Sequence, residues 1–499
     1  MSFKNKLFSR FPARYISYKV KDSAEAEEII KGYKAIRKNS LFDDGFYLRK
    51  YPKVKASGMD PLLHYIFYGF SEGKKPNENF DGVFYKNHYS DVNINPLVHY
   101  ALYGMDENRL TKVDKKDLSY FRQSNKSVLF VLHEKIGTVG GCGFFNMDII
   151  RNLPDSYTAF ILTCDGEDME LWVNNQGLEK IANYDVCDVE DDFHSKKLAG
   201  IYFEILSKLN IDIVHINHLI NHSFDLIDCI NSKSIPFLVN LHDFYYICPS
   251  IHLIDEDCSY CNLNCRGCRW ADSIEKWREK CGDVLKKSYL NIAPSNSAVE
   301  IYKNIFPQLD NFKVISHGVD VNESLYAAKL TSKPVRILVP GHISQHKGSL
   351  LIKELKKIDK NNNLELHFLG TAIPNLNKYG INHGRYERSD FNEIVAEIKP
   401  SFSLILSVCP ETYSYTLTES WMAGIPVIAS NLGALKERIG LTNAGWLVDY
   451  RNPESIYEFI LNITQKDYDD KLASVSGIEF KSLKEMSMEY IDLYNKLCD

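Results

Sequence analysis

From residue 127 onward, the chain alternates strand-length runs of β-branched and aromatic residues with amphipathic helical patterns. One series of these runs ends at residue 318, and a second begins at residue 335, just after the segment LTSKP. This alternation is typical of parallel sheets joined by crossover helices. It predicts two consecutive doubly wound α/β domains with a ligand site in the cleft between them, because such folds bind ligands beyond the carboxyl ends of their strands. The expected strands are 127–134, 157–164, 212–218, 236–243, 291–295 and 313–318, then 335–343, 364–370, 402–408, 426–430 and 445–449.

Residues 42–109 contain an internal repeat. FDDGFYLRKYPKV and DPLLHYIFYGFSEGKKP recur as FDGVFYKNHYSDV and NPLVHYALYGMDENR. The repeat predicts two copies of a small helical unit that bury their aromatic faces against each other. His64 and His99 also match, and we interpret them as packed, hydrogen-bonded side chains rather than ligands. The best-matched pairs are Phe46 with Phe84, Tyr51 with Tyr89, Leu62 with Leu97 and Tyr65 with Tyr100.

These patterns divide the chain into five expected parts. A basic N-terminal segment covers 1–38, and a two-copy aromatic repeat module covers 39–115. The first Rossmann-like domain covers 125–328 and contains a cysteine-rich loop at 248–281. The second covers 334–465, and a helical tail covers 466–499.

Charge and hydropathy exclude some functions. Fifty-nine basic and 65 acidic residues give a net charge of -6, which disfavours a protein that works mainly on nucleic acid. No apolar run approaches the ~18 residues of a spanning helix, and the N-terminus does not resemble a signal peptide, so we expect a cytoplasmic protein. The first 21 residues carry six basic and no acidic side chains. This segment is either a contact for an anionic membrane surface or a solvated tail.

Two glutamates mark the first candidate site, in CPETYSYTLTESWMAGIPVIAS. Glu411 and Glu419 stand eight positions apart after an expected strand, and Ser414 is the expected N-cap of the next helix. Free amides at a helix start suit a phosphate, and carboxylates accept hydrogen bonds from sugar hydroxyls. The segment therefore indicates a nucleotide-sugar site. The alternative is a pair of surface charges that flank a helix.

A second segment, PGHISQHKGSLLI, supports the first. Gly341 is expected to close a strand, and Lys347 and Gly348 to open the next helix. A cation and free amides at this point suit a diphosphate, whereas the alternative is a solvated lysine. Because the two segments belong to separate strand–helix units of one sheet, their joint occurrence favours the nucleotide-sugar interpretation.

Residues from about 127 to 450 resemble glycosyltransferase family 4, whose members are retaining enzymes with the GT-B architecture of two facing Rossmann-like domains. Glu411, Glu419 and AGIPVIAS match the family's pair of glutamates, small-residue helix and G-x-P-V strand. Lys347, six residues after Gly341, matches its donor-phosphate lysine. TVGGCGFFNMDII resembles its glycine-rich loop, and LVNLHDFYYICP its strand-ending histidine segment. The resemblance thus implies an acceptor domain at 125–328 and a donor domain at 334–465.

The resemblance also implies a role for each matching residue. Glu411 would bind the hydroxyls of the transferred sugar, and Glu419 the ribose. Lys347 would neutralise the diphosphate as the glycosidic bond breaks. His242 would line the sugar and acceptor side of the cleft. The other matching positions are Gly140 and Gly141 in the loop near donor and acceptor, and Gly341, His342, Gly348, Thr412, Tyr413 and Ser414 around the donor.

Two departures from the family pattern lie in the donor site. His342 stands where the family usually has arginine, which leaves one permanent charge fewer for the diphosphate, although His346 would add a charge if it were protonated. Thr412, Tyr413 and Ser414 replace the glycines that commonly follow the first glutamate. The family usually needs no metal, and the departing phosphate itself is thought to deprotonate the acceptor, so we expect that catalysis requires no cofactor.

Six of the twelve cysteines lie between residues 248 and 281. The segment CSYCNLNCRGC contains two C-x-x-C pairs, and four thiolates at this spacing could close a structural zinc site. Cys248 or Cys281 could replace one ligand, and an iron–sulfur cluster or plain thiols remain open alternatives. The expected ligands are Cys258, Cys261, Cys265 and Cys268.

Together these features predict a glycosyltransferase of the hexosyltransferase class that uses a nucleotide-diphosphate sugar. The repeat module resembles one found ahead of bacterial surface-polysaccharide transferases. This implies work on a glycan or lipid-linked oligosaccharide in O-antigen, lipopolysaccharide or capsule synthesis, in the cytoplasm and in peripheral contact with the inner membrane. The main alternative is a catalytically silent sugar-nucleotide-binding or scaffold subunit of an assembly complex. An epimerase or phosphorylase of the same fold ranks last, because epimerases lack the glutamate pair and the repeats.

Overall fold

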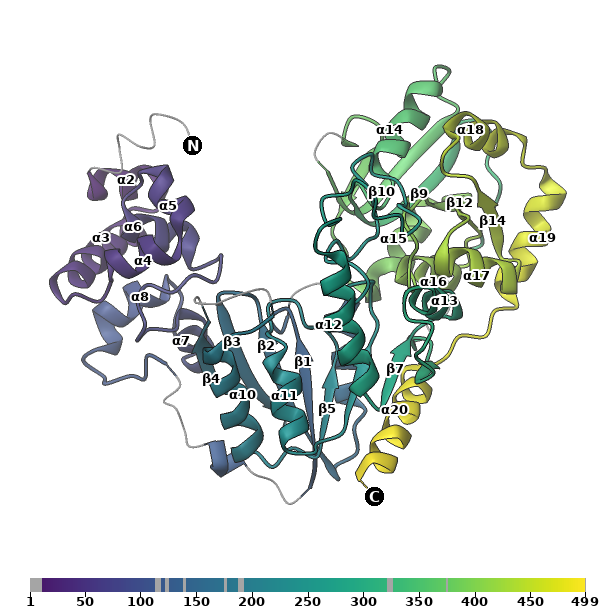
Figure 1. The fold of residues 1–499 in the computed structure, drawn as a ribbon. Helices are drawn as coiled ribbons and strands as arrows, with labels where there is room; N and C mark the ends of the chain where they lie inside the picture. Colours follow the sequence, from purple (N-terminus) through teal and green to yellow (C-terminus); the bar gives the residue numbers. More distant parts are fainter. Residues whose placement is uncertain are drawn as a thin grey trace. The chain divides into compact units, whose positions relative to one another are not determined.

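The structure is a computed structural model that describes residues 11–112, 118–121, 125–137, 141–174, 177–186, 193–320, 326–373 and 376–498. Contacts divide the chain into two compact units. The first comprises residues 1–120 with 180–187, and the second comprises residues 121–179 with 188–499. Figure 1 labels the elements of each unit.

The first unit is built from short helices around an aromatic core. Tyr15, Tyr47, Tyr65 and Tyr85 are completely buried in it. Residues 11–38 belong to the same core, whereas residues 1–10 of the expected basic segment lie outside the described residues. The elements are α2 (Pro12–Lys19), α3 (Ser23–Lys38), α4 (Asp44–Lys50), α5 (Pro52–Ser57), α6 (Pro61–His64), the π-helix η1 (Tyr65–Gly69), α7 (Gly82–His88), α8 (Pro96–His99), the π-helix η2 (Tyr100–Gly104) and the 3₁₀ turn η3 (Leu118–Phe121).

The two copies of the repeat make the same contacts. In the first copy a hydrogen bond joins the Tyr47 hydroxyl to Nδ1 of His64 at 3.0 Å, and in the second the Tyr85 hydroxyl lies 3.2 Å from Nδ1 of His99. Each histidine is followed by a π-helix. The interpretation of both histidines as packed, hydrogen-bonded side chains is therefore confirmed.

The first sheet of the second unit has the strand order β3-β2-β1-β5-β6-β7-β8. All neighbours pair in parallel except β3, which is antiparallel to β2. The strands are β1 (Lys126–Leu132), β2 (Tyr157–Cys164), β3 (Asp168–Asn174), β5 (Ile213–Ile216), β6 (Phe237–Asn240), β7 (Leu290–Ala293) and β8 (Phe312–Val314). The helices are α9 (Gly141–Arg151), α10 (Lys196–Lys208), α11 (Asp225–Ser232), α12 (Ile274–Lys287), α13 (Asn296–Ile305) and α20 (Leu483–Cys498).

The second sheet is entirely parallel, with the order β11-β10-β9-β12-β13-β14. Its strands are β9 (Val335–Ile343), β10 (Leu364–Ala372), β11 (Ile381–Gly384), β12 (Phe402–Ile405), β13 (Val427–Ser430) and β14 (Gly445–Val448). Its helical elements are α14 (Ser349–Ile358), the 3₁₀ turn η5 (Arg388–Asp390), α15 (Phe391–Ile398), α16 (Tyr415–Met422), α17 (Gly433–Thr442), α18 (Pro453–Asn462) and α19 (Gln465–Ser476).

The prediction of an α/β chain with two doubly wound sheets behind a helical module is confirmed. Three strands were not expected from the sequence: β3, β11 and β4 (Leu178–Asp185). β3 and β4 carry charged residues within their runs, and the first three residues of β11 are exposed. The sequence pattern of these strands therefore lacks the continuous apolar signal of a central parallel strand.

The last helix, α20, returns to the first sheet. Met486, Tyr490 and Tyr494 are buried in the core of that domain, and the Tyr494 hydroxyl lies 2.6 Å from Nδ1 of the buried His215. The C-terminal helix thus packs into the core of the first Rossmann-like domain, although it follows the second domain in sequence.

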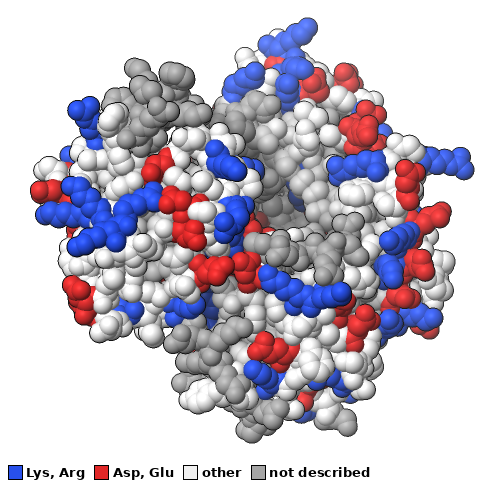
Figure 2. Space-filling model, turned by 60° about the vertical axis from the view of Figure 1, so that its left-hand side comes forward, with Lys and Arg blue, Asp and Glu red and all other residues white. Residues whose placement is uncertain are grey.

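Basic and acidic side chains are interspersed on the face shown in Figure 2, where neither sign forms a continuous surface. Among the helices that the structure describes, none is both long and apolar enough to cross a membrane.

Candidate active site

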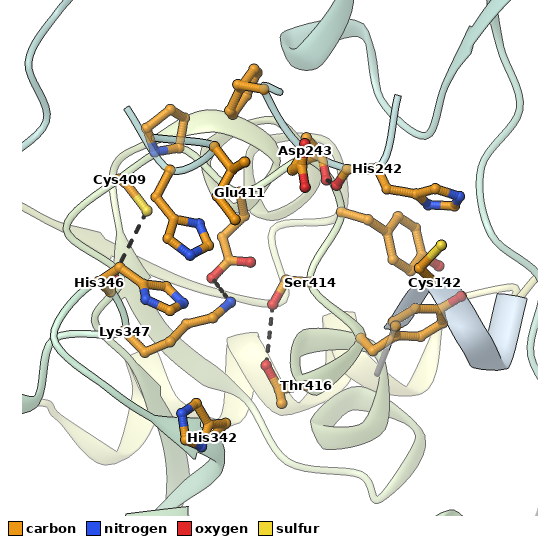
Figure 3. A pocket seen from close by; sticks show the side chains of 18 of the residues that line it. Cys142, His242, Asp243, His342, His346, Lys347, Cys409, Glu411, Ser414 and Thr416 are labelled. Carbon is orange, nitrogen blue, oxygen red and sulfur yellow. Dashed lines mark hydrogen bonds and ion pairs between the residues drawn. The ribbon is translucent and has the colours of Figure 1, made fainter. Parts of the chain in front are cut away.

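Residues of both Rossmann-like domains line a cavity of about 420 Å³ in the second unit. One wall follows the carboxyl ends of β1, β5 and β6, and the other follows β9 and β12. Figure 3 shows Lys347 and Glu411 pointing toward each other, with His242 and Asp243 on the opposite side. Of the predicted site residues, the cavity is lined by Gly141, His242, His342, Lys347, Glu411, Thr412, Tyr413 and Ser414.

Lys347 and Glu411 form the central ion pair of this cavity. Lys347 Nζ lies 2.5 Å from Glu411 Oε1, and the Ser407 hydroxyl donates to the same oxygen. Burial on its own would raise the pKa of Glu411, but the Lys347 charge and the two hydrogen bonds outweigh burial and lower this pKa. Glu411 is therefore a carboxylate. The Lys347 side chain remains 35% exposed, which leaves its ammonium accessible to an anionic ligand.

Glu419 has different surroundings and is not among the described residues that line the cavity. The Tyr386 hydroxyl donates to Glu419 Oε2 at 2.8 Å, and Arg388 Nε lies 3.8 Å from Oε1. Burial raises the pKa of Glu419 despite both partners. The two glutamates are thus held differently, Glu411 by a cation in the cavity and Glu419 by a phenol and a more distant arginine.

Arg388 also connects the two domains. Its guanidinium lies over the rings of Phe144 from α9 and Tyr415 from α16, 4.4 Å and 4.3 Å from their centroids. Its Nη1 lies 3.7 Å from Asp148 Oδ2 on α9. Sequence reasoning did not find this residue, because it begins a 3₁₀ turn in a segment without a motif.

Gly341 and Gly348 do not line the cavity in the described part of the chain, but the backbone requires both. Their φ angles are +98° and +80°, and a Cβ on Gly348 would lie 2.1 Å from the Leu406 carbonyl oxygen. The expectation that Gly341 closes its strand is wrong, because β9 pairs with β10 as far as Ile343. Gly348 precedes α14, whose first turn has no side-chain cap.

The segment after Glu411 contacts the first Rossmann-like domain. The Thr412 hydroxyl donates to the His242 carbonyl at 2.6 Å, and the Tyr413 hydroxyl donates to the His317 carbonyl at 3.0 Å. Ser414 occupies the expected N-cap position of α16, but its side chain does not cap the helix. Its φ is +74°, and its side chain makes no cap hydrogen bond but lies 3.2 Å from the Thr416 hydroxyl. The left-handed backbone turns the hydroxyl away from the helix amides that a cap must reach.

The histidines near Lys347 are uncharged or exposed. His346 stacks on His252 at 3.8 Å between ring centroids, and burial, together with His252 and Lys347, lowers the pKa of His346 to about 3. His346 therefore adds no positive charge at neutral pH, contrary to the suggestion from sequence. His342 is exposed, and its Nδ1 lies 2.5 Å from the Thr371 hydroxyl.

On the opposite wall, His242 is half-buried, its ring makes a T-shaped contact with Phe145, and its Nε2 lies 3.1 Å from Asn217 Oδ1. Burial is the main reason that the pKa of His242 falls to about 3. Beside it, Asp243 Oδ2 lies 3.0 Å from His218 Nε2. Gly141 begins α9 and faces the Tyr415 ring, whereas Gly140 lies outside the described residues.

Seven histidines line the cavity, and sequence reasoning missed four of them. His133 comes directly after β1, His218 two residues after β5, and His317 three residues after β8. The available signal was a histidine within the last two residues of several expected strands. The missed lining histidines are His133, His218, His252 and His317.

The four cysteines of the predicted zinc site are not equivalent. Cys258 Sγ lies 3.7 Å from Gln345 Oε1, whereas Cys265 Sγ accepts a hydrogen bond from Arg278 Nη2 at 3.2 Å. We searched the described residues for groups of three or more His, Cys, Asp or Glu side chains whose ligand atoms all lie within 4.8 Å of one another. One group among these residues meets this condition, and it does not include the cysteines. That group consists of His194, Asp225 and Asp228.

Comparison with known proteins agrees with this geometry. Residues 334–466 match the family model described as "Glycosyl transferases group 1". Over 224 residues the chain is 24% identical to the colanic acid biosynthesis glycosyl transferase WcaC of Escherichia coli K12, across 41% of this chain and 52% of that protein. The chain therefore spans about half the length of this curated relative.

Solved structures extend the likeness to the fold of the second unit. The sucrose-phosphate synthase of Thermosynechococcus elongatus has a TM-score of 0.52 at 13% identity, over 75% of this chain and 99% of its own. HepE of Anabaena in complex with UDP has a TM-score of 0.50 at 14% identity, over 74% of this chain and all of its own. Residues 334–466 are thus a glycosyl transferases group 1 domain, within a unit that has the GT-B fold.

Proposed function

We propose that this chain transfers a sugar from a nucleoside diphosphate sugar to a glycan hydroxyl, with retention of anomeric configuration, in the assembly of a bacterial surface polysaccharide such as O-antigen or capsule. The observation that carries the proposal is the Lys347–Glu411 pair, which belongs to the group 1 domain and lines the cavity. The name of the colanic acid relative supports the setting, and the UDP named in the HepE complex supports the donor class.

In this proposal, donor binding breaks the Lys347–Glu411 ion pair and gives each side chain a new partner on the donor. The accessible Lys347 ammonium turns to the diphosphate oxygens next to the start of α14, where no side chain caps the helix and its positive dipole end favours an anion. Glu411, released from Lys347, accepts hydrogen bonds from the hydroxyls of the transferred sugar. Glu419, with Tyr386 beside it, binds the ribose. Lys347 therefore holds the nucleotide while Glu411 orients the reacting sugar.

Transfer then breaks the bond between the anomeric carbon and the phosphate oxygen, and the nucleoside diphosphate leaves with the electron pair. Lys347 stabilises the negative charge that grows on this phosphate in the transition state. The acceptor oxygen forms a bond to the anomeric carbon on the same face from which the phosphate departs. The proton of the acceptor hydroxyl passes to an oxygen of the departing phosphate. His242 and the neighbouring polar groups of the first domain hold the acceptor hydroxyl.

The test is nucleotide release by the purified chain from a panel of UDP, GDP, ADP and dTDP sugars with glycan acceptors. We expect release with at least one donor, and a fall toward background in Glu411→Ala and Lys347→Ala. Lys357→Ala is the matched control, because Lys357 lies on α14 in an exposed pair with Glu354. Release that is the same in all four proteins would contradict transfer and favour the silent-subunit alternative.

Two finer parts of the proposal have their own measurements. The anomeric configuration of the product, determined by NMR, tests retention, and the same assay without added divalent metal tests the expectation that catalysis needs none. We also propose that residues 1–21 contact anionic membranes. If the chain without them sediments with anionic vesicles as well as the full chain does, this contact is wrong.

A further inference from the structure

The segment between β6 and α12 carries five cysteines and an unusual backbone. Several of its non-glycine residues have left-handed φ angles. Such conformations persist only where the surroundings hold them in place. The strand pairing within this segment is a single bridge, between Ile254 and Tyr260. Another interaction must therefore hold these residues in their left-handed conformations. The left-handed residues are Ile251, Leu253, Cys258, Asn262 and Leu263.

Three of the sulfur atoms accept a hydrogen bond from the amide two residues further along the chain. The Ser250 amide donates to Cys248 Sγ at 3.4 Å, and the Trp270 amide donates to Cys268 Sγ at 3.4 Å. Cys261 accepts from the Leu263 amide in the same way. These backbone donors hold the three sulfurs in place, as outer hydrogen bonds hold the side chains that bind a metal.

Arg278 of α12 connects two parts of this segment. Its Nε donates to the Ile247 carbonyl at 3.2 Å, next to Cys248, and its Nη2 donates to Cys265 Sγ at 3.2 Å. Arg278 thus connects the backbone beside Cys248 with the Cys265 sulfur. Cys258 instead has Gln345 of the second domain as its partner.

We propose that Cys248, Cys261, Cys265 and Cys268 bind one structural Zn²⁺ as a tetrathiolate and that Cys258 is not a ligand. Binding releases the four thiol protons, and the resulting site carries two net negative charges. The Arg278 guanidinium offsets this charge, and the amide donors orient the sulfurs. Cys248 thus takes the place that spacing alone gives to Cys258.

Metal binding requires this segment to close around the ion. Zinc–sulfur bonds of about 2.3 Å place tetrahedral ligands about 3.8 Å apart. Among the described residues, no three of these sulfurs are mutually within 4.8 Å. Closure fixes the wall of the cavity as well, because Ile251 and His252 line it and His252 stacks on His346. The zinc therefore has a structural role close to the site without taking part in a chemical step.

The test is the metal content of the full chain, purified without chelators and analysed by plasma mass spectrometry. We expect about one zinc per chain, loss of most of it in Cys248→Ser and Cys265→Ser, and full retention in Cys258→Ser. Cys258→Ser is a closely matched control, because Cys258 lies in the same segment and forms a C-x-x-C pair with Cys261. Wild-type protein without zinc, or with iron and labile sulfide, overturns the proposal, and so does loss of zinc in Cys258→Ser with retention in Cys248→Ser.

A second measurement uses the wild-type chain, so it does not depend on whether a variant folds. Replacement of the zinc in the wild-type chain by Co²⁺ should give the ligand-field and sulfur-to-cobalt charge-transfer bands of a tetrahedral tetrathiolate. A six-coordinate cobalt spectrum overturns the proposal. Neither measurement depends on sugar transfer, so the metal site and the proposed function can fail separately.

Discussion

The two walls of the cavity differ in the charged groups that they contain. The wall from the second Rossmann-like domain contains a full ion pair, Lys347 with Glu411. The wall from the first domain contains no lysine or arginine among its described residues, but imidazoles and the carboxylates of Glu134 and Asp243. Burial is the main cause that lowers the pKa of His133 to about 4 and that of His242 to about 3. A wall with an exchangeable cation suits a charged diphosphate, whereas uncharged imidazoles and carboxylates suit an uncharged hydroxyl. The difference supports a donor on one side and an acceptor on the other.

The largest expected effect is that of Glu411→Gln. The variant keeps the shape of the side chain but removes the charge that pairs with Lys347. Because Glu411 is proposed to orient the reacting sugar, we expect kcat to fall by about 10² to 10³, with less change in nucleotide affinity. Steady-state kinetics and calorimetric titration with the nucleotide measure the two quantities.

Unchanged kcat in Glu411→Gln would mean that the charge on this wall serves only to hold Lys347. Lys357→Ala is again the control, because its exposed pair lies on the same helix, α14, that follows Lys347.

The contrast between the walls also explains what the sequence could predict. The apolar runs of the second sheet and the segments with Lys347 and Glu411 are local patterns, so they identified five of its strands and these two residues, but not the ion pair between them. The histidines of the other wall come from the ends of separate strands, and only the sheet order brings them together. The effect of Ser414 depends on a left-handed backbone, and that of Arg388 on packing between domains, and neither leaves a periodic signal.

The second largest effect is expected where the two walls meet, at Asp148 and Arg388. Burial raises the pKa of Asp148 to about 6 despite the Arg388 charge. Because this pKa is above the unfolded value, the folded state binds the proton more tightly, and stability falls as pH rises from about 4 to about 6. Asp148→Asn avoids this loss. We expect it to be more stable than the wild type by about 1–3 kcal/mol at pH 8 and equally stable near pH 4.

Urea unfolding at the two pH values measures the effect of Asp148→Asn. Asp155→Asn, at an exposed position just after α9, should show no such difference. A less stable Asp148→Asn at pH 8 would mean that the ion pair with Arg388 outweighs the cost of burial, and the walls would then be joined by charge.

A smaller effect is expected for His242→Asn on the wall of the first domain. The shorter side chain removes one hydrogen-bonding group from the cavity, so we expect the KM for the acceptor to rise about tenfold. Nucleotide affinity should change less than twofold, because Lys347 and Glu411 are untouched. Acceptor kinetics and nucleotide titration separate the two, with the exposed His88→Ala as the control. An equal loss of nucleotide affinity would show that the walls do not divide donor from acceptor.

The smallest effect is expected for Thr412→Val, which preserves shape and removes the hydrogen bond between the walls. The Thr412 hydroxyl donates to the His242 carbonyl at 2.6 Å, and its loss should cost about 1 kcal/mol. Because this bond positions Glu411 relative to the acceptor wall, kcat should fall a few-fold while nucleotide affinity is kept. Thr442→Val removes a similar bond inside α17, to the Arg438 carbonyl, and should lower only stability. If both variants lower kcat equally, the bond to His242 has no positioning role, and each wall acts independently of the other.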